Sequence, residues 1–137
     1  MNREWRLLLL QSLKQLFMIR FTRSVGFALN GIRCCFTGEA HFKIHTLSAL
    51  LATGAAFFLK VSRTEWLMLL VCMAAVFTAE LINTALEELC NIVYREQHAG
   101  IKKAKDMAAA AVLVAAITAA ITGSVIFIPK IHEILFG

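Results

Sequence analysis

Residues 66–93 of the sequence are WLMLLVCMAAVFTAELINTALEELCNIV. This stretch is longer than the roughly 20 residues that a helix needs to cross a bilayer. It nevertheless carries Glu80, Asn83, Glu87 and Glu88. Such side chains are costly in hydrocarbon unless they face protein or water. The stretch therefore predicts a membrane-spanning helix whose polar residues have a function.

Two more apolar stretches predict two more crossings, at about 44–59 and 107–128, and Pro129 is expected to stop the last one. Hydrophobic residues make up 59% of the chain and charged residues 17%, whereas a soluble domain has about 45–50% and about 25%. A chain of 137 residues has room for one domain of roughly 100–150 residues. We therefore predict an all-α membrane protein, a single domain over 1–137 with three transmembrane helices at about 44–59, 66–93 and 107–128.

The N-terminal region, residues 1–36, is basic and alternates apolar and charged residues at near-helical spacing. It predicts an amphipathic helix that lies on the membrane surface before the first crossing. Gly31 and Gly38 are expected to break this region, so that the chain can turn into the bilayer. The start of the chain has no small-residue cleavage site, so no secretory signal is expected.

Basic residues predict the orientation of the crossings. Residues 1–43 contain seven lysines and arginines and the 94–106 link contains four, whereas the 60–64 link contains two and the tail after Pro129 one. Because Lys and Arg are enriched in cytoplasmic loops, we expect the N-terminus and the 94–106 link on the cytoplasmic side of the inner (cytoplasmic) membrane. The net charge of +5 then reflects orientation and anionic lipid, and no nucleic-acid partner is expected.

The cysteines and histidines show no metal-binding spacing. Cys34, Cys35, Cys72 and Cys90 form no Cys-x-x-Cys pair and have no histidines at zinc-finger distance. Two of them fall inside the predicted spans. They predict free thiols, and a zinc site has little support.

Three polar residues of the second span share one face of the helix. At about 100° per residue, Glu80, Asn83 and Glu87 lie within about 60° of one another, and Glu88 lies at the edge of that face. A single amide or acid can simply join helices by interhelical hydrogen bonds. Two acids and an amide in register instead indicate a catalytic site or a path for protons or ions.

Further charged residues stand where cytoplasmic segments meet the spans: Glu39 before the first span, and Lys105 and Asp106 before the third. Mg²⁺ prefers a few carboxylate oxygens together with nucleotide phosphates. Phosphoryl transfer needs this ion, a cation for the phosphates and a base for the attacking hydroxyl. The side chains that suit these roles are Glu39, Glu87, Lys105 and Glu80. No glycine-rich nucleotide-binding loop occurs in the sequence, which excludes a soluble nucleotide-binding fold.

The polar stretch and the start of the third span together form a specific motif. The chain has Glu80-Leu-Ile-Asn83-Thr84-Ala85-Leu-Glu87, followed further along by Ala104-Lys105-Asp106. This resembles the signature of the prokaryotic diacylglycerol kinase family, E-x-x-N-[ST]-A-x-E followed by A-K-D. The resemblance extends to Gly31-Ile-Arg33, Glu39-Ala-His-Phe42-Lys43 and Glu96-Gln97-His98, and covers about residues 20–128.

The resemblance implies a homotrimer of three-span subunits, with active sites between neighbouring subunits, that transfers phosphate from ATP with Mg²⁺ to the hydroxyl of a membrane lipid. It implies that Glu80 is the catalytic base, that Glu39 and Glu87 bind the metal and the nucleotide, and that Asn83 supports them. The other positions that it implies for ATP binding are Arg20, Glu96, His98, Lys105 and Asp106. Phe27 departs from the family pattern, because the diacylglycerol kinase branch has there a tyrosine that contacts the nucleotide.

The family has two branches, which phosphorylate diacylglycerol or undecaprenol. The stretch Phe42-Lys43-Ile44-His45 is more similar to the undecaprenol branch, so undecaprenol is the favoured acceptor. Two other classes stay open on the residues alone. A small ion-coupled transporter would use the intramembrane glutamates as a proton relay, although it leaves the cytoplasmic charges unexplained. A structural adaptor would tolerate leucine at Glu80 and Asn83.

Overall fold

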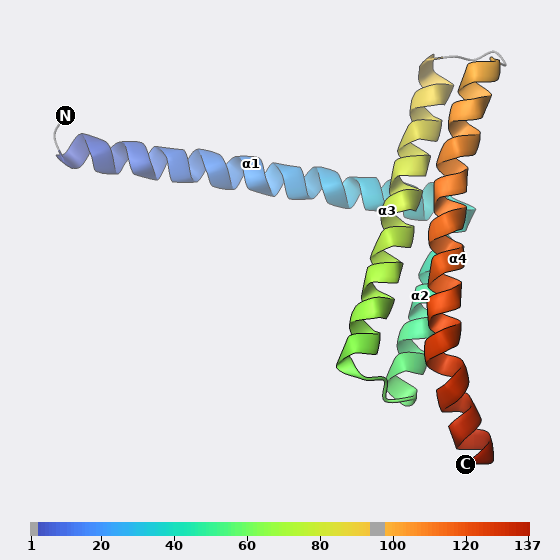
Figure 1. Cartoon of the computed structure of the whole chain (residues 1–137). Coiled ribbons are helices and arrows are strands. Elements are labelled where there is room, and N and C mark those ends of the chain that lie inside the picture. The colour runs from blue at the N-terminus through green and yellow to red at the C-terminus, as the bar shows by residue number, and fades with distance from the viewer. Residues whose placement is uncertain (1–2, 94–97) are drawn as a thin grey trace. The chain divides into compact units, whose positions relative to one another are not determined.

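The computed structural model describes the backbone of residues 3–93 and 98–137, and the side chains of residues 11, 13–93 and 98–137. All regular structure in these ranges is α-helical, which confirms the all-α prediction for this part of the chain. The helices are α1 (Arg3–Gly38), α2 (Ala40–Phe58), α3 (Arg63–Val93) and α4 (Ala99–Phe136) (Figure 1). Contacts divide the chain into two units, Met1–Thr37 and Gly38–Gly137.

The first unit is a single long helix. α1 is unbroken over 36 residues and ends at Gly38, so the expected interruption at Gly31 is wrong. A glycine inside a helix costs about 1 kcal/mol relative to alanine, and one such residue does not end a long helix. Large apolar side chains are exposed on every side of α1 rather than on one face, among them Leu13, Phe17, Ile19, Phe27 and Phe36. The expected amphipathic pattern is therefore weak.

The second unit starts at the junction between α1 and α2. Glu39 has an extended backbone (φ −105°, ψ 123°) and ends the helical run. α2 then begins at Ala40, earlier than the predicted crossing at 44–59, and runs to Phe58. The turn toward α3 uses Lys60 in the left-handed region, at φ 48°.

Among the residues that the structure describes, two helices are long and apolar enough to cross a membrane, α3 and α4. They contain the predicted second and third crossings. α2 is not one of the two, because His41, Lys43 and His45 near its start lower its mean hydropathy. A first crossing by α2 therefore stays a prediction.

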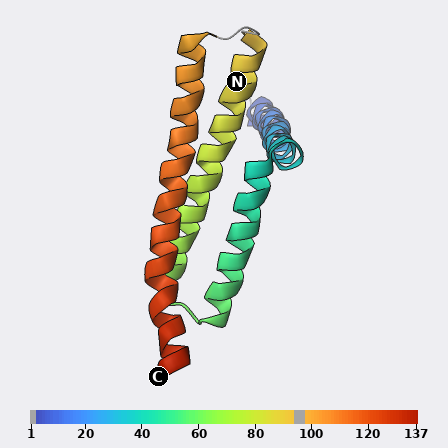
Figure 2. The same ribbon diagram turned by 90° about the vertical axis from the view of Figure 1, so that its right-hand side faces the viewer.

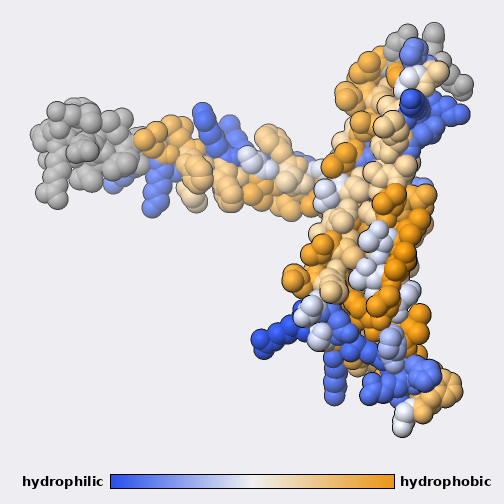
Figure 3. Space-filling view, viewed as in Figure 1, coloured by the Kyte–Doolittle hydropathy of each residue, from blue (hydrophilic) through white to orange (hydrophobic). Residues whose placement is uncertain are grey.

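Most of the apolar surface of α3 and α4 is exposed within the subunit. Figure 3 shows apolar side chains over the middle of the helices and hydrophilic ones at the lower end of the second unit. Exposed apolar surface of this extent indicates contact with lipid or with other subunits.

α3 and α4 are neighbours along their length, and they share most of the contacts between helices, whereas α2 touches both of them less (Figures 1 and 2). Small residues allow this close approach, because alanine side chains keep two helix backbones near each other. Ala108 and Ala111 of α4 lie opposite Ala75 and Ala79 of α3 in one groove. The pair α3–α4 is thus the rigid frame of the second unit.

The start of α4 differs from the prediction. α4 begins at Ala99, so Lys105 and Asp106 stand on the helix and not in a polar link. His98 favours this start, because its Nδ1 accepts a hydrogen bond from the Gly100 N–H at 3.2 Å. This bond satisfies one of the backbone donors that every helix leaves unpaired at its N-terminus.

The other end of α4 also differs from the prediction. The helix continues through Pro129 and ends at Phe136, so Pro129 does not stop it. Proline removes one backbone hydrogen bond and bends a helix, but helices in membranes tolerate it when the freed groups find other partners. Figure 1 shows α4 bent toward its C-terminal end.

The start of α3 is fixed by polar bonds and by a small apolar cluster. The Ser62 N–H donates to Glu65 Oε2 (2.6 Å) and the Glu65 N–H donates to Ser62 Oγ (3.3 Å), which is a capping box. Lys130 Nζ of α4 lies 3.3 Å from the same Glu65 oxygen. The buried residues of the cluster are Ala56, Val61, Leu69 and Ile126. This end of the unit therefore joins all three of its helices.

Candidate active site

Glu80 lies in the middle of α3 and is 4% exposed, which makes it the one buried charged side chain in the described part of the chain. The surrounding residues are good helix formers such as Leu and Ala, so the helix runs through this position without a break. A buried carboxylate on an apolar helix indicates a functional group rather than a packing residue.

The next polar residues on α3 are bonded to each other. Asn83 Nδ2 donates a hydrogen bond to Glu87 Oε1 at 3.3 Å, and both side chains are half-buried. The two residues are four positions apart, the spacing at which side chains of one helix face meet. The amide therefore orients the Glu87 carboxylate. We call the polar face of α3 formed by Glu80, Asn83 and Glu87 the stripe.

The other polar atom of the Asn83 side chain has no hydrogen-bond partner among the residues that the structure describes. Its Oδ1 is buried and accepts no hydrogen bond within the described residues. Asn83 lines a groove of about 460 Å³ between α3 and α4, together with Thr78, Ile82 and small alanines of both helices. Buried acceptors are nearly always satisfied in proteins, so an unpaired oxygen at this place marks Asn83 as a candidate site residue.

The stripe has a further polar residue that the sequence interpretation missed. Asn91 Oδ1 accepts a hydrogen bond from Lys105 Nζ at 3.3 Å, which joins the end of α3 to the start of α4. The signal was present in the sequence, since Asn91 follows Glu87 by four residues and so lies on the same helix face. Lys105 is half-buried, whereas Asp106 beside it is exposed.

The two residues expected to bind metal lie on different elements, Glu39 just before α2 and Glu87 on α3. Glu39 is half-buried at the start of α2, and its side chain makes no capping hydrogen bond there. The described residues contain no group of three or more His, Cys, Asp or Glu side chains able to hold a metal ion. Mg²⁺ usually takes one or two protein carboxylates and completes its shell with water and phosphate oxygens. The metal role of Glu39 and Glu87 thus stays a prediction.

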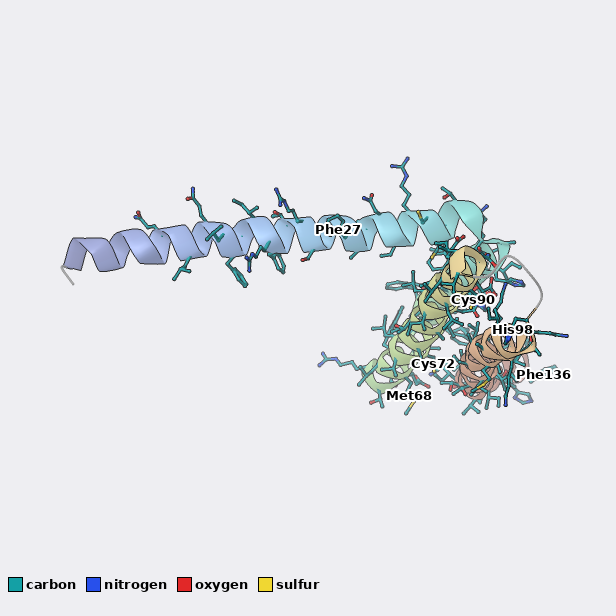
Figure 4. The ribbon with its side chains drawn as sticks, turned by 90° about the horizontal axis from the view of Figure 1, so that it is seen from above. Phe27, Met68, Cys72, Cys90, His98 and Phe136 are labelled. Carbon is teal, nitrogen blue, oxygen red and sulfur yellow. The ribbon has the colours of Figure 1, made fainter. Side chains whose placement is uncertain are left out.

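The other expected nucleotide positions belong to different parts of the chain. Arg20 and Phe27 are exposed on α1, in the first unit, and Phe27 is 74% exposed. Glu96 lies outside the described residues. His98 lies at the start of α4, at the same end of the α3–α4 pair as Cys90 (Figure 4). The four cysteines are free thiols, as predicted.

A second, larger hollow lies between α2, α3 and α4. It has a volume of about 550 Å³ and an almost entirely apolar lining, with His45 and Ser48 of α2 and Ser124 of α4 among the few polar residues. Phe77 of α3 also lines it, three residues before Glu80. The hollow therefore offers space for hydrocarbon within about one helical turn of the buried carboxylate.

Comparison with known proteins relates most of the chain to one family. Residues 26–127 match the family model described as prokaryotic diacylglycerol kinase. The undecaprenol kinase of Bacillus subtilis is 34% identical over 112 residues, which cover 82% of this chain and 91% of that protein. The diacylglycerol kinase of Escherichia coli is 33% identical over 103 residues, covering 75% and 84%.

A third relative, the diacylglycerol kinase of Pseudomonas aeruginosa, is 37% identical over 110 residues, which cover 80% of this chain and 89% of that protein. The relative named undecaprenol kinase and the relatives named diacylglycerol kinase are thus similar to the chain to about the same degree. These matches do not favour an ion-coupled transporter. A membrane kinase family also agrees with the two apolar helices long enough to cross a bilayer. The chain belongs to the prokaryotic diacylglycerol kinase family.

Proposed function

We propose that this chain transfers the terminal phosphate of ATP, with Mg²⁺, to the hydroxyl of a membrane lipid at the cytoplasmic surface of the inner membrane. As a member of its family it is a lipid kinase. The observation that carries the proposal is the buried Glu80 on an apolar helix, followed on the same face by the bonded pair Asn83 and Glu87. Such a stripe gives a base and oriented acceptors next to hydrocarbon.

In this proposal Glu80 takes the proton from the lipid hydroxyl as that oxygen attacks the phosphate. General bases of this kind typically contribute about 10²–10⁴-fold to a rate. Lys105, held near the end of α3, contacts the phosphates and offsets their negative charge. Asn83 keeps Glu87 oriented, and His98, Asp106, Arg20 and Glu96 complete the nucleotide site.

Glu39 and Glu87 would hold the magnesium ion. Their chemistry fits, because Mg²⁺ takes oxygen ligands and needs few of them from the protein when it also binds phosphates. The bond from Asn83 fits as well, since ligating carboxylates are usually fixed by a neighbouring donor. When bound, the ion would neutralise charge on the transferring phosphate.

Undecaprenol is the favoured acceptor and diacylglycerol the alternative. The stretch Phe42-Lys43-Ile44-His45 supports undecaprenol, and the apolar hollow of about 550 Å³ supports either hydrocarbon tail. The distribution of basic residues supports a cytoplasmic N-terminus. The exposed apolar surface of α3 and α4 supports a homotrimer in the membrane. In this trimer α2 is a third crossing and α1 lies along the membrane surface.

The test is phosphate transfer from ATP with Mg²⁺ to undecaprenol and to diacylglycerol, in parallel micelle assays. We expect transfer to undecaprenol at the higher rate, and a loss of about 100-fold or more in Glu80→Gln. Glu88→Gln is the matched control, because Glu88 is exposed on the same helix. Full activity in Glu80→Gln would overturn the role of this base, and no transfer to either lipid would overturn the function.

A further inference from the structure

Asn91 continues the polar stripe of α3 toward the link to α4. Glu80, Asn83, Glu87 and Asn91 follow one another at spacings of three, four and four residues, which places them within an arc of about 80°. The stripe thus runs along one face of α3 for about three turns. Asn91, the last residue of the stripe, is exposed, whereas Glu80, the first, is buried.

A hydrogen bond joins the last residue of this stripe, Asn91, to the neighbouring helix. Lys105 Nζ, from the second turn of α4, donates a hydrogen bond to Asn91 Oδ1 at 3.3 Å. A free lysine side chain samples many rotamers, and fixing it costs conformational entropy. A lysine already held against α3 has met part of this cost before a nucleotide arrives.

The chemistry of the acceptor matters as much as its position. An amide oxygen is neutral, so it holds the ammonium group without cancelling its charge. The ammonium has three N–H donors, and Asn91 uses one of them. The charge and two donors therefore remain for phosphate oxygens.

We infer that Asn91 is a positioning residue for nucleotide binding, which holds Lys105 in place for the phosphates of ATP. This inference rests on the proposed kinase function. Asn91 itself need not touch ATP. Its loss lowers the affinity for ATP and leaves the chemistry at Glu80 unchanged.

The test compares Asn91→Ala with the wild-type chain in the lipid kinase assay, with ATP and lipid varied separately. We expect KM for ATP to rise about three- to tenfold, as for loss of an exposed hydrogen bond to a charged group. We expect kcat and KM for the lipid to stay within about twofold, because the base and the lipid site are untouched. Ile92→Ala is the matched control, since Ile92 is the next residue and is 77% exposed.

A double-mutant cycle separates positioning from a general structural effect. If Asn91 acts through Lys105, Asn91→Ala adds nothing to KM for ATP in a Lys105→Met background. Asn91→Ser repeats the test with a polar side chain if the alanine variant does not fold. An unchanged KM in an active Asn91→Ala enzyme, or equal effects in both backgrounds, overturns the inference and leaves the function standing. A wild-type chain that transfers no phosphate overturns both.

Discussion

Of the two polar atoms in the Asn83 side chain, one is hydrogen-bonded and the other has no partner among the described residues. Its Nδ2 donates to Glu87, while its buried Oδ1 accepts nothing within the described residues. Leaving a buried acceptor unsatisfied typically costs about 1–3 kcal/mol. A residue with a purely structural role would not be expected to leave its acceptor unsatisfied. We therefore interpret Asn83 as part of a binding site that a substrate or a second subunit completes.

Replacing Asn83 by leucine separates function from stability. We expect Asn83→Leu to raise the temperature of thermal unfolding in detergent, because it removes the unsatisfied acceptor from an apolar helix. We expect the same variant to lose about tenfold or more of its phosphate-transfer rate, because Glu87 loses its donor. Circular dichroism and the lipid kinase assay check the two halves.

The control for this variant is Ile82→Leu, which changes a 61% exposed neighbour without altering polarity. Full activity in Asn83→Leu would favour a purely structural role for the amide. A lower unfolding temperature would instead show that Oδ1 is satisfied in the assembled protein.

At the scale of the helices, the two ends of the α3–α4 pair are held differently. Lys105 and Asn91 share one hydrogen bond at the end that carries the stripe. At the other end the Glu65 carboxylate takes part both in the capping box with Ser62 and in the ion pair with Lys130. Pro129 removes a backbone hydrogen bond just before Lys130, and the ion pair is a contact between the part of α4 that follows the bend and the start of α3.

This arrangement predicts an order of effects on stability. Glu65→Ala removes the cap and the ion pair, whereas Lys130→Met removes only the pair. Isolated ion pairs near the surface contribute little, while caps contribute more. We therefore expect Glu65→Ala to lower the unfolding temperature more than Lys130→Met.

Thermal unfolding of the full chain in detergent, followed by circular dichroism, measures this order. Lys103→Met serves as the control for loss of one exposed positive charge on α4. Equal effects of Glu65→Ala and Lys130→Met would contradict the order, since they would mean that the capping box contributes nothing.

At the scale of the whole molecule, the sequence was sufficient where periodicity or composition decides the structure. The apolar stretch 66–93 predicted α3, and the spacing of Glu80, Asn83 and Glu87 placed them on one face. Positions that depend on the neighbouring helix were not predictable in this way. The bond between Lys105 and Asn91 can be predicted only when the packing of α3 against α4 is known, because the two residues are fourteen positions apart.

Helix ends were the least predictable feature, for a local reason. The sequence predicts that Pro129 stops the last crossing and that Lys105 lies in a polar link, but α4 runs from Ala99 to Phe136. A proline kinks or breaks a helix because it lacks an N–H and its ring clashes with the carbonyl four residues earlier, but helices in membranes tolerate it when neighbouring groups satisfy the freed backbone. His98 caps this early start of α4, because its Nδ1 accepts a hydrogen bond from the Gly100 N–H.

The largest prediction concerns the assembly. Most of the apolar surface of α3 and α4 is exposed in the part of the subunit that the structure describes, and Arg20 lies on α1, in a different unit from Glu80. Closed symmetric oligomers commonly cover such surface. We expect a particle in detergent with three times the subunit mass of 15.2 kDa, measured by native mass spectrometry.

Shared active sites can be tested with two inactive variants in one assembly. If Arg20 of one subunit serves the Glu80 of another, random trimers of Arg20→Ala and Glu80→Gln subunits contain some sites in which both residues are intact. Chance pairing makes this about one site in four, so about a quarter of the wild-type activity should return on mixing. Sites built within one subunit would give no recovery, because every subunit then carries a defect. A monomer with full activity would contradict the trimer as well, and would assign the exposed faces of α3 and α4 to lipid alone.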